Sequence, residues 1–249
     1  MALPSLYLSP HPHSAHNARV LVALEYGGQR ARLVETRRGA SAGDVAGLPA
    51  VEAESGGQVW GGAAVSHLLA PAAMRGSCGE EAALVRQWTS YADIELLPIA
   101  CASTFPAPGL LKHNKQAVDR APVELRKTLR FLDDHLRLRT YLVGEKITLA
   151  DVAVSCALLL PYQHVFNPEC RKPFVNANRW FETCVNQPEF RRALGEVKFC
   201  DGRPPTSGEK SAGELCRVCR KTNQDHNQTI RSVQTQAKGN NLQCKIKSD

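Results

Sequence analysis

The sequence has few aromatic residues and no long apolar run, and both shortages exclude classes of protein. Aromatic residues make up 6% of the 249 residues, and methionine occurs twice. The longest nearly apolar stretch, Val152–Leu160, stops at Pro161, whereas a membrane-spanning helix needs about 20 apolar residues. The first 13 residues lack a basic segment followed by an apolar run, so we expect no secretory signal. The 43% hydrophobic content is typical of a soluble globular protein.

The cysteines lack the spacing of a disulfide framework. Nine of them are scattered from Cys78 to Cys244, and their number is odd. Small secreted domains with stabilising disulfides normally carry an even number at regular spacings. We therefore expect reduced thiols and a cytoplasmic protein.

The excess of positive charge is concentrated at one end of the chain. Lysine and arginine number 31 against 24 acidic residues, which gives a net charge of +7. Residues 200–249 contribute +4 of this charge, and the other 199 residues contribute +3. A basic domain surface that binds nucleic acid is therefore not implied by the total charge.

Residues 1–75 show the pattern of a small mixed α/β domain. Ser14 can cap a helix that ends at Gly27–Gly28. Short runs typical of strands surround this helix, and a small-residue helix follows them. The predicted strands are Leu6–Leu8, Arg32–Glu35, Leu48–Val51 and Val59–Trp60, and the second helix is Ala63–Leu69. We predict a βαβ unit followed by a β-hairpin and a helix.

Residues 76–199 show only helical periodicity. Helices are predicted at about 80–101, 122–138, 152–160, 178–185 and 189–194. The first is expected to present Leu84, Trp88, Tyr91 and Glu95 on one face. The second presents Leu125, Leu129, Leu132 and Leu136 on one face.

The clearest helix start lies before the apolar run that begins at Val152. Thr148 and Asp151 have the spacing of a capping box, and Ile147 and Val152 occupy the flanking hydrophobic positions. Because the run has no polar face, we expect this helix to be the buried centre of the helical domain.

The last 50 residues change in composition. Polar residues dominate residues 200–249, large apolar residues are few, and no periodicity remains. The sequence thus predicts three parts: an α/β domain at 1–75, an all-helical domain at 76–199, and a basic, disordered tail at 200–249.

This layout resembles the glutathione transferases, in which a thioredoxin-like α/β domain packs on an all-helical domain. Leu48–Pro49 is similar to the motif whose cis proline presents backbone to glutathione in that family. Residues Tyr141–Asp151 resemble the family's capping-box segment. The resemblance implies structural roles for Pro49, Thr148 and Asp151.

A narrower resemblance covers about residues 3–199. Residues 178–197 resemble the end of the transferase-like domain that elongation factor 1-gamma shares with cytosolic valyl-tRNA synthetase. Residues 6–12, 59–65 and 87–93 resemble the appended domain of the synthetase. Elongation factor 1-gamma usually has a Glu-Ser-Asn-Ala-Ile-like run where this chain has Gly61–Val65.

The resemblance implies a non-catalytic interaction module that docks onto elongation factor 1 subunits or other transferase-like domains in the cytoplasm. The chain carries neither signature motif of a class I synthetase, so we expect a truncated or alternative product without the aminoacylation core. The whole parent protein would be a valine–tRNA ligase. The alternatives are an elongation factor 1-gamma-type subunit and a glutathione-dependent transferase.

A glutathione transferase needs a hydroxyl or thiol near the first helix, and Tyr7 and Ser14 lie in that region. Their ordinary structural roles are those of a strand residue and a helix cap. At Gly61 and Gly62, active relatives have an acidic residue followed by Ser or Thr. Two glycines supply no carboxylate or hydroxyl, so we predict a degenerate glutathione site at Ser14, Pro49, Gly61 and Gly62. No cofactor is expected.

Two further groups of residues could bind a metal ion, but their patterns favour simpler roles. A zinc site from Cys216, Cys219, His226 and Cys244 has only one close cysteine pair. A histidine cluster lies beside prolines and is typical of a solvated turn. It comprises His11, His13 and His16. No metal site is predicted.

The second long helix carries a basic face that could contact tRNA phosphates. It comprises Arg126, Lys127, Arg130, Arg137 and Arg139. Glu124, Asp133 and Asp134 oppose this face, which favours a solvated surface. No membrane contact and no specific nucleic-acid partner are expected from this chain.

Overall fold

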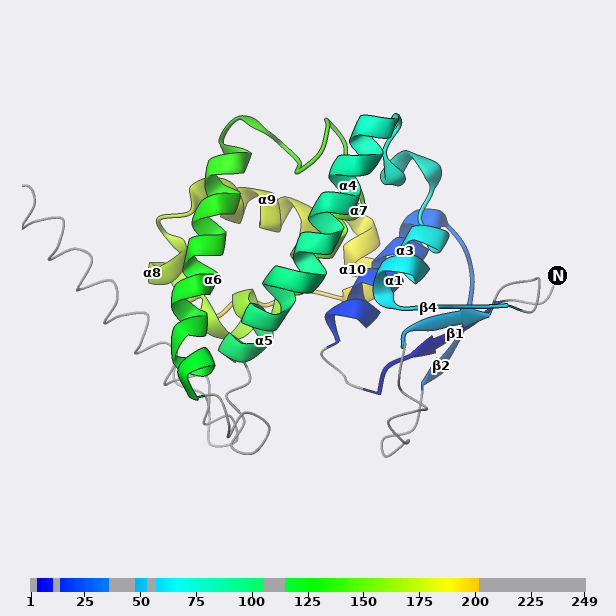
Figure 1. Ribbon diagram of the computed structural model, residues 1–249, viewed down its shortest axis with the longest axis horizontal. Helices are drawn as coiled ribbons and strands as arrows, with labels where there is room; N and C mark the ends of the chain where they lie inside the picture. The colour runs from blue at the N-terminus through cyan, green and yellow to red at the C-terminus, as the bar shows by residue number, and fades with distance from the viewer. Residues whose placement is uncertain (1–3, 11–13, 36–47, 53–56, 105–114, 202–249) are drawn as a thin grey trace, which may run out of the picture.

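The computed structural model describes residues 4–10, 14–35, 48–52, 57–104 and 115–201. A small sheet with two helices lies beside a larger group of helices, and the two parts are in contact (Figure 1). No helix in these ranges is long and apolar enough to cross a membrane.

The sheet has four strands in the order β2-β1-β3-β4. Strand β1 (Ser5–Leu8) pairs in parallel with β2 (Arg32–Glu35) and antiparallel with β3 (Ala50–Glu52), which pairs with β4 (Gln58–Trp60). The parallel pair requires a crossover, and α1 (Ala15–Gly27) supplies it. The βαβ unit and hairpin predicted from the sequence are both present.

Local sequence explains both ends of α1. The hydroxyl of Ser14 accepts a hydrogen bond from the backbone N–H of Asn17 at 3.3 Å, as an N-cap does. Gly28 ends the helix with a φ of 60°, a left-handed conformation that glycine adopts without a Cβ clash. On the other side of the hairpin, α3 (Gly62–Leu69) begins directly after β4.

The second part of the molecule has helices and connecting loops but no strands among its described residues. Its elements are η1 (Ala72–Arg75), α4 (Gly79–Tyr91), η2 (Ala92–Leu96), α5 (Leu97–Thr104), α6 (Lys115–His135), η3 (Leu136–Leu138), α7 (Leu149–Leu160), η4 (Pro161–Val165), α8 (Pro168–Arg171), α9 (Val175–Val185) and α10 (Pro188–Leu194).

Helix α7 forms the centre of this part. Of its twelve residues, only Leu159 is not fully buried, because the neighbouring helices cover every side of it. It packs against α4, α5 and α9, and also against α1 of the sheet-bearing part. The predicted buried central helix is confirmed.

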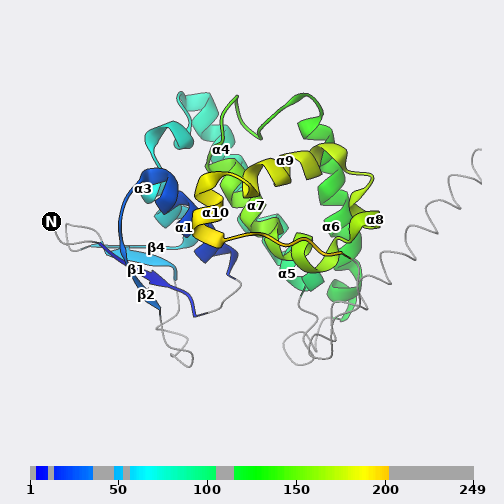
Figure 2. The ribbon, with the colours of Figure 1, turned by 180° about the vertical axis from the view of Figure 1, so that it is seen from behind.

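Helix α1 holds the two parts together. It packs against α3 on its own side and against α7 and α10 of the helical part; Figure 2 shows α10 beside α1 from behind. Arg192 of α10 also donates from Nε to Glu25 of α1 at 2.8 Å.

The helix predicted at 80–101 differs from the structure in its buried face. Leu84 is exposed and Glu95 is exposed, while Val85, Trp88 and Leu96 are buried. The π-helical segment η2 interrupts the α-helix and changes its register, which a 3.6-residue period does not anticipate. The predicted face is wrong at both ends: the register change accounts for Glu95, whereas Leu84 lies before η2 on α4, where Val85 and Trp88 form the buried side.

Helix α6 begins earlier than predicted. It starts at Lys115, and Pro122 lies inside it instead of opening it. The leucine face is confirmed, because Leu125, Leu129, Leu132 and Leu136 are all 0% exposed. The short helix α8 was not predicted; Asn167 caps it by accepting from the N–H of Cys170 at 2.8 Å.

Candidate functional site

The hairpin and the start of α3 bring three of the predicted site residues together. The Leu48–Pro49 peptide bond is cis. The carbonyl of Pro49 accepts from the N–H of Gly61 at 2.9 Å, so these two residues adjoin. Gly61 has a φ of 90° and precedes the first residue of α3, Gly62.

The first turns of α1 face Gly62 with two basic side chains. A Cβ added at Gly62 would lie 2.7 Å from Nδ1 of His16 and 2.9 Å from Nη2 of Arg19. Real Cβ atoms do not approach other atoms so closely, so a serine or threonine at this position would have to displace these side chains. A side chain at position 62 therefore fits only if His16 and Arg19 move.

Arg19 is held by a carboxylate from the other part of the molecule. Its Nη2 donates to both carboxylate oxygens of Asp93 in η2, at 2.9 and 3.0 Å. The Arg19 side chain is 2% exposed and the Asp93 side chain 26%. We call this pair the Arg19–Asp93 clasp. It joins α1 to the helical part, with Arg19 buried and Asp93 partly exposed.

His16 completes the clasp as a neutral ring. Its Nδ1 lies 3.2 Å from Nη2 of Arg19 and 3.8 Å from Oδ1 of Asp93. Burial, followed by the charge of Arg19, lowers the pKa of His16, and Asp93 opposes this only in part. A neutral Nδ1 can then accept a hydrogen bond from Arg19.

One donor of the clasp has no partner. Nη1 of Arg19 is buried and makes no hydrogen bond within the described residues. A buried unpaired donor costs free energy, about 1–3 kcal/mol for ordinary groups and more for charged ones. The clasp is therefore not fully satisfied by the protein itself.

The cavity beside Ser14 contains no activated nucleophile among the residues that line it. Ser14, Cys156 and Gln163 lie in its wall, and its volume is about 230 Å³. Burial raises the pKa of the Cys156 thiol to about 12, and a protonated thiol is a poor nucleophile. The Ser14 hydroxyl is engaged as the N-cap of α1.

The capping box at Thr148 is built around a buried carboxylate. Asp151 accepts from the N–H of Thr148 at 2.9 Å and from its hydroxyl at 3.1 Å. It also accepts from the N–H of Leu142 at 2.9 Å and from Nε1 of Trp180 at 2.8 Å. Burial raises the pKa of Asp151, and these four hydrogen bonds oppose the rise. The surroundings of Asp151 are those of a structural residue.

The predicted metal ligands fall in different parts of the chain. His11, His13, Cys216, Cys219, His226 and Cys244 lie outside the described residues. His16 is described, and it belongs to the clasp. Across the described ranges, no group of three or more His, Cys, Asp or Glu residues could hold a metal ion.

The clasp joins two residues that no pattern in the sequence connects. Arg19 interrupts the apolar side of α1 next to Val20, and a charged residue in that position is a signal of a buried pair. Asp93, however, is 74 residues away, and no local pattern connects the two. The contact of Trp180 with Asp151 was also not anticipated.

Comparison with known proteins identifies the fold. Residues 88–188 match the family model of the glutathione S-transferase C-terminal domain. The GST-like domain of elongation factor 1-gamma from Saccharomyces cerevisiae is 20% identical with a TM-score of 0.67, over 81% of this chain and 97% of that one. A glutathione S-transferase of Vibrio parahaemolyticus is 18% identical with a TM-score of 0.64, over 79% of this chain and 100% of that one.

The chain therefore has the glutathione-transferase fold, as predicted. Elongation factor 1-gamma of Equus caballus and of Homo sapiens are each 40% identical over 227 residues, covering 85% of this chain and 51% of the relative. The chain contains a transferase-like domain related to that of elongation factor 1-gamma. It spans about half the length of the curated relatives it matches. These comparisons favour elongation factor 1-gamma over the valyl-tRNA synthetase interpretation.

Proposed function

We propose that this chain is a non-catalytic interaction module of translation, of the elongation factor 1-gamma type. It acts in the cytoplasm, binds no glutathione, and docks onto elongation factor 1 subunits or other transferase-like domains. The 40% identity to elongation factor 1-gamma supports the assignment to translation. The division into parts 1–75, 76–199 and 200–249 belongs to the same proposal.

The observation that carries the non-catalytic function is the contact at Gly62. In active relatives, by the family resemblance, an acidic residue and a hydroxyl hold the polar end of glutathione at positions 61 and 62. Here His16 and Arg19 occupy the space that a side chain at 62 would need. The nearby carboxylate, Asp93, is already paired with Arg19. A ligand would lose charge-assisted hydrogen bonds of about 1.5–3 kcal/mol each.

An exposed apolar surface supports docking. Five large apolar side chains on β4, α3, α4, η2 and α6 are exposed, and we propose that they form one surface. They are Trp60, Leu68, Leu84, Ile94 and Phe131. We call this surface the apolar face. Scattered apolar side chains are ordinary, but several on one face of a protein are typical of an interaction surface.

A binding assay with purified elongation factor 1 subunits tests this proposal. We expect Ile94→Glu to weaken binding at least tenfold in analytical ultracentrifugation, because it places a charge in the apolar face. Val175→Glu is the matched control: Val175 is 68% exposed against 70% for Ile94, and it lies on α9, which carries none of the five residues. Equal binding by the two variants would contradict the assigned surface, and no binding by the unmodified chain would contradict the function.

The parent protein admits a second candidate, the valyl-tRNA synthetase appendage. The run Gly61–Val65 favours this second candidate, because the run differs from the one usual in elongation factor 1-gamma. Mass spectrometry of the endogenous protein, captured with an antibody to residues 115–201, distinguishes the two. Peptides of a class I synthetase core would support the second candidate, and peptides of an elongation factor 1-gamma C-terminal region would exclude it.

A further inference from the structure

Two arginines of α6 share one aromatic support. The Cζ atoms of Arg126 and Arg130 lie 5.7 and 5.8 Å from the ring centroid of Phe174. Residues four apart lie on the same face of a helix, and the ring of Phe174 is buried beneath them. The cation–π contacts restrict where the two guanidinium groups can lie. The pair is therefore partly organised before any ligand arrives.

The carboxylates that the sequence sets against this pair have other partners. Glu124 accepts from Nζ of Lys127 at 2.8 Å. Oδ1 of Asp133 accepts from the N–H groups of Asn176 and Ala177, at 2.8 and 3.0 Å, at the start of α9. Within the described ranges neither Arg126 nor Arg130 forms an ion pair. Both guanidinium groups therefore remain without a direct carboxylate partner in this part of the chain.

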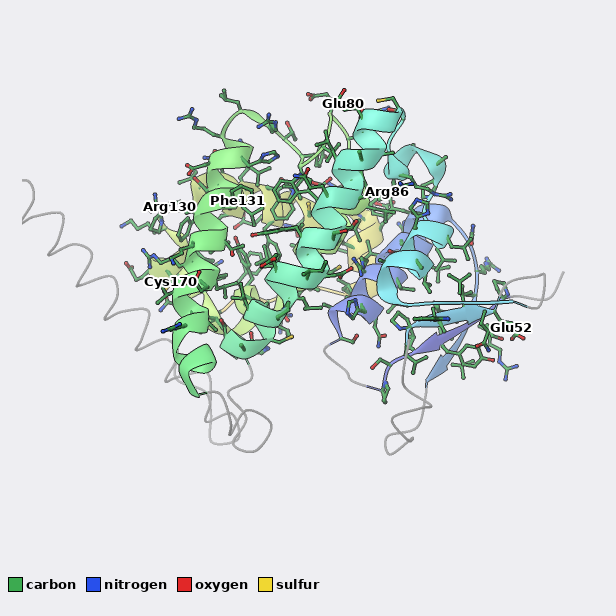
Figure 3. All side chains as sticks on the ribbon, in the orientation of Figure 1. Glu52, Glu80, Arg86, Arg130, Phe131 and Cys170 are labelled. Carbon is green, nitrogen blue, oxygen red and sulfur yellow. The ribbon has the colours of Figure 1, made fainter. Side chains whose placement is uncertain are left out.

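A third positive charge lies close by in the sequence. Lys172 is exposed and lies two residues before Phe174, directly after α8. Figure 3 labels Arg130 on α6 and Cys170 on α8 at the same edge of the helical part. We call Arg126, Arg130 and Lys172 the Phe174 patch. Exposed carboxylates at Asp134 and Glu169 flank it on the same two helices and reduce its charge without pairing with the arginines.

Arg171 shows that not every basic residue here is available. Its Cζ lies 5.1 Å from the ring centroid of Phe199, and its Nη2 donates to the carbonyl of Cys200 at 3.2 Å. It holds the segment after α10 against the helical part, so it is excluded from the patch.

We infer that the Phe174 patch binds the phosphate backbone of RNA. Guanidinium groups present planar arrays of donors that match phosphate oxygens. The one aromatic ring of the patch is buried and offers no free surface for base stacking, so binding is expected without base selection. The choice of RNA over an acidic protein segment rests on the proposed function in translation; the patch itself rests on the contacts described above.

Salt dependence of RNA binding by residues 1–249 tests this inference. Fluorescence anisotropy with labelled bulk tRNA, repeated at several KCl concentrations, gives the slope of log K against log salt. Each lost phosphate contact reduces the slope by roughly 0.7–0.9. We therefore expect the double variant Arg126→Ala with Arg130→Ala to reduce it by roughly 1.4–1.8. The basic residues 200–249 remain in every sample, so their contribution cancels in the comparison.

Lys127→Ala is the matched control, because it removes one charge from the same helix but from a residue already paired with Glu124. We expect its slope to equal that of the unmodified chain. Lys172→Glu tests the patch without touching the buried ring, and it should also lower the slope. If the double variant loses its helical circular dichroism, Lys172→Glu decides the question.

Equal slopes for the unmodified chain and both patch variants would overturn the inference. Displacement of the RNA by polyglutamate at equal charge concentration would also overturn it in favour of an acidic protein partner. The Ile94→Glu experiment changes a residue of η2 that is not part of the Phe174 patch. Failure of the RNA assay therefore leaves the docking result standing, and the reverse is also true.

Discussion

Asp151 and Arg19 are both charged side chains in the interior, but their surroundings differ. Asp151 is 0% exposed and accepts four hydrogen bonds, three of them from residues within nine positions of it. Arg19 depends on a single carboxylate from the other part of the molecule, and its Nη1 group has no partner among the described residues. The first charge organises one helix start; the second joins two parts of the protein.

Substitutions at the two sites are therefore expected to affect different properties of the protein. A locally satisfied carboxylate serves folding, and its removal leaves several buried donors unpaired at once. The clasp joins α1 to the helical part and lies next to Gly62, where we propose that the glutathione contacts have been lost. Changes at the clasp are therefore expected to affect the joining of the two parts before they affect either core.

The largest expected effect is that of Asp151→Ala. It leaves the N–H groups of Leu142 and Thr148 and Nε1 of Trp180 without an acceptor, and each buried unpaired donor costs about 1–3 kcal/mol. We expect a loss of about 3–5 kcal/mol in unfolding free energy, measured by urea denaturation. Asp134→Ala, at an exposed position on α6, should change stability by less than about 0.5 kcal/mol. Similar losses for both variants would contradict the assigned role of Asp151.

Asp93→Ala is expected to have the next largest effect. It leaves the guanidinium of Arg19 buried and unpaired, which we expect to cost about 2–4 kcal/mol since Asp93 itself is partly exposed. Calorimetry should then show two separated transitions, because the joining contact is weakened. The double variant Arg19→Leu with Asp93→Ala should recover part of the loss. A single, equally cooperative transition in Asp93→Ala would argue against the joining role.

Gly62→Ser tests the steric part of the account. The new side chain would meet His16 and Arg19, and we expect a loss of about 1–3 kcal/mol, as for other overpacked positions. Gly79→Ser is the control, because a Cβ at Gly79 meets no atom within 4 Å. His16→Ala combined with Gly62→Ser should recover much of the loss in thermal denaturation. No difference between Gly62→Ser and Gly79→Ser would sink the steric argument.

The smallest expected effect is on pH dependence. The folded protein lowers the pKa of His16, so the unfolded chain binds the proton more readily. Stability contributed by the neutral ring is present above the unfolded pKa of about 6.5 and is lost as the pH falls through the lower folded pKa. His16→Gln should flatten the unfolding free energy between pH 7.5 and 5.5. Because the pKa of His67 is lowered too, His67→Gln measures the part that does not come from the clasp.

Sequence predicted the features that depend on neighbours in the chain. The cap at Ser14, the capping box at Thr148 and the leucine face of α6 are all local patterns, and each is present in the structure. The burial of Leu96 in place of Glu95 follows from the register change at η2, which periodicity does not encode. Leu84 lies before η2, and its exposure shows that the buried side of α4 passes through Val85 and Trp88.

Only part of the candidate site follows from the sequence, because the rest depends on residues that are far apart in the chain. The two glycines at 61 and 62 predict lost ligand contacts, but they do not predict that the side chains of His16 and Arg19 lie next to Gly62. Arg19 and Asp93 meet through the packing of α1 against the helical part, and tertiary packing of residues so far apart has no local signature. His16 was grouped with the neighbouring histidines, whereas its environment is set by Arg19.

Isothermal titration with glutathione tests the central claim most directly. The account holds that the Arg19–Asp93 clasp and His16 have replaced the glutathione contacts at Gly62. Titration of residues 1–249 with millimolar glutathione should therefore give no binding heat, while an active glutathione transferase measured in parallel gives a saturating curve. Saturable binding of glutathione at micromolar concentration would contradict the claim.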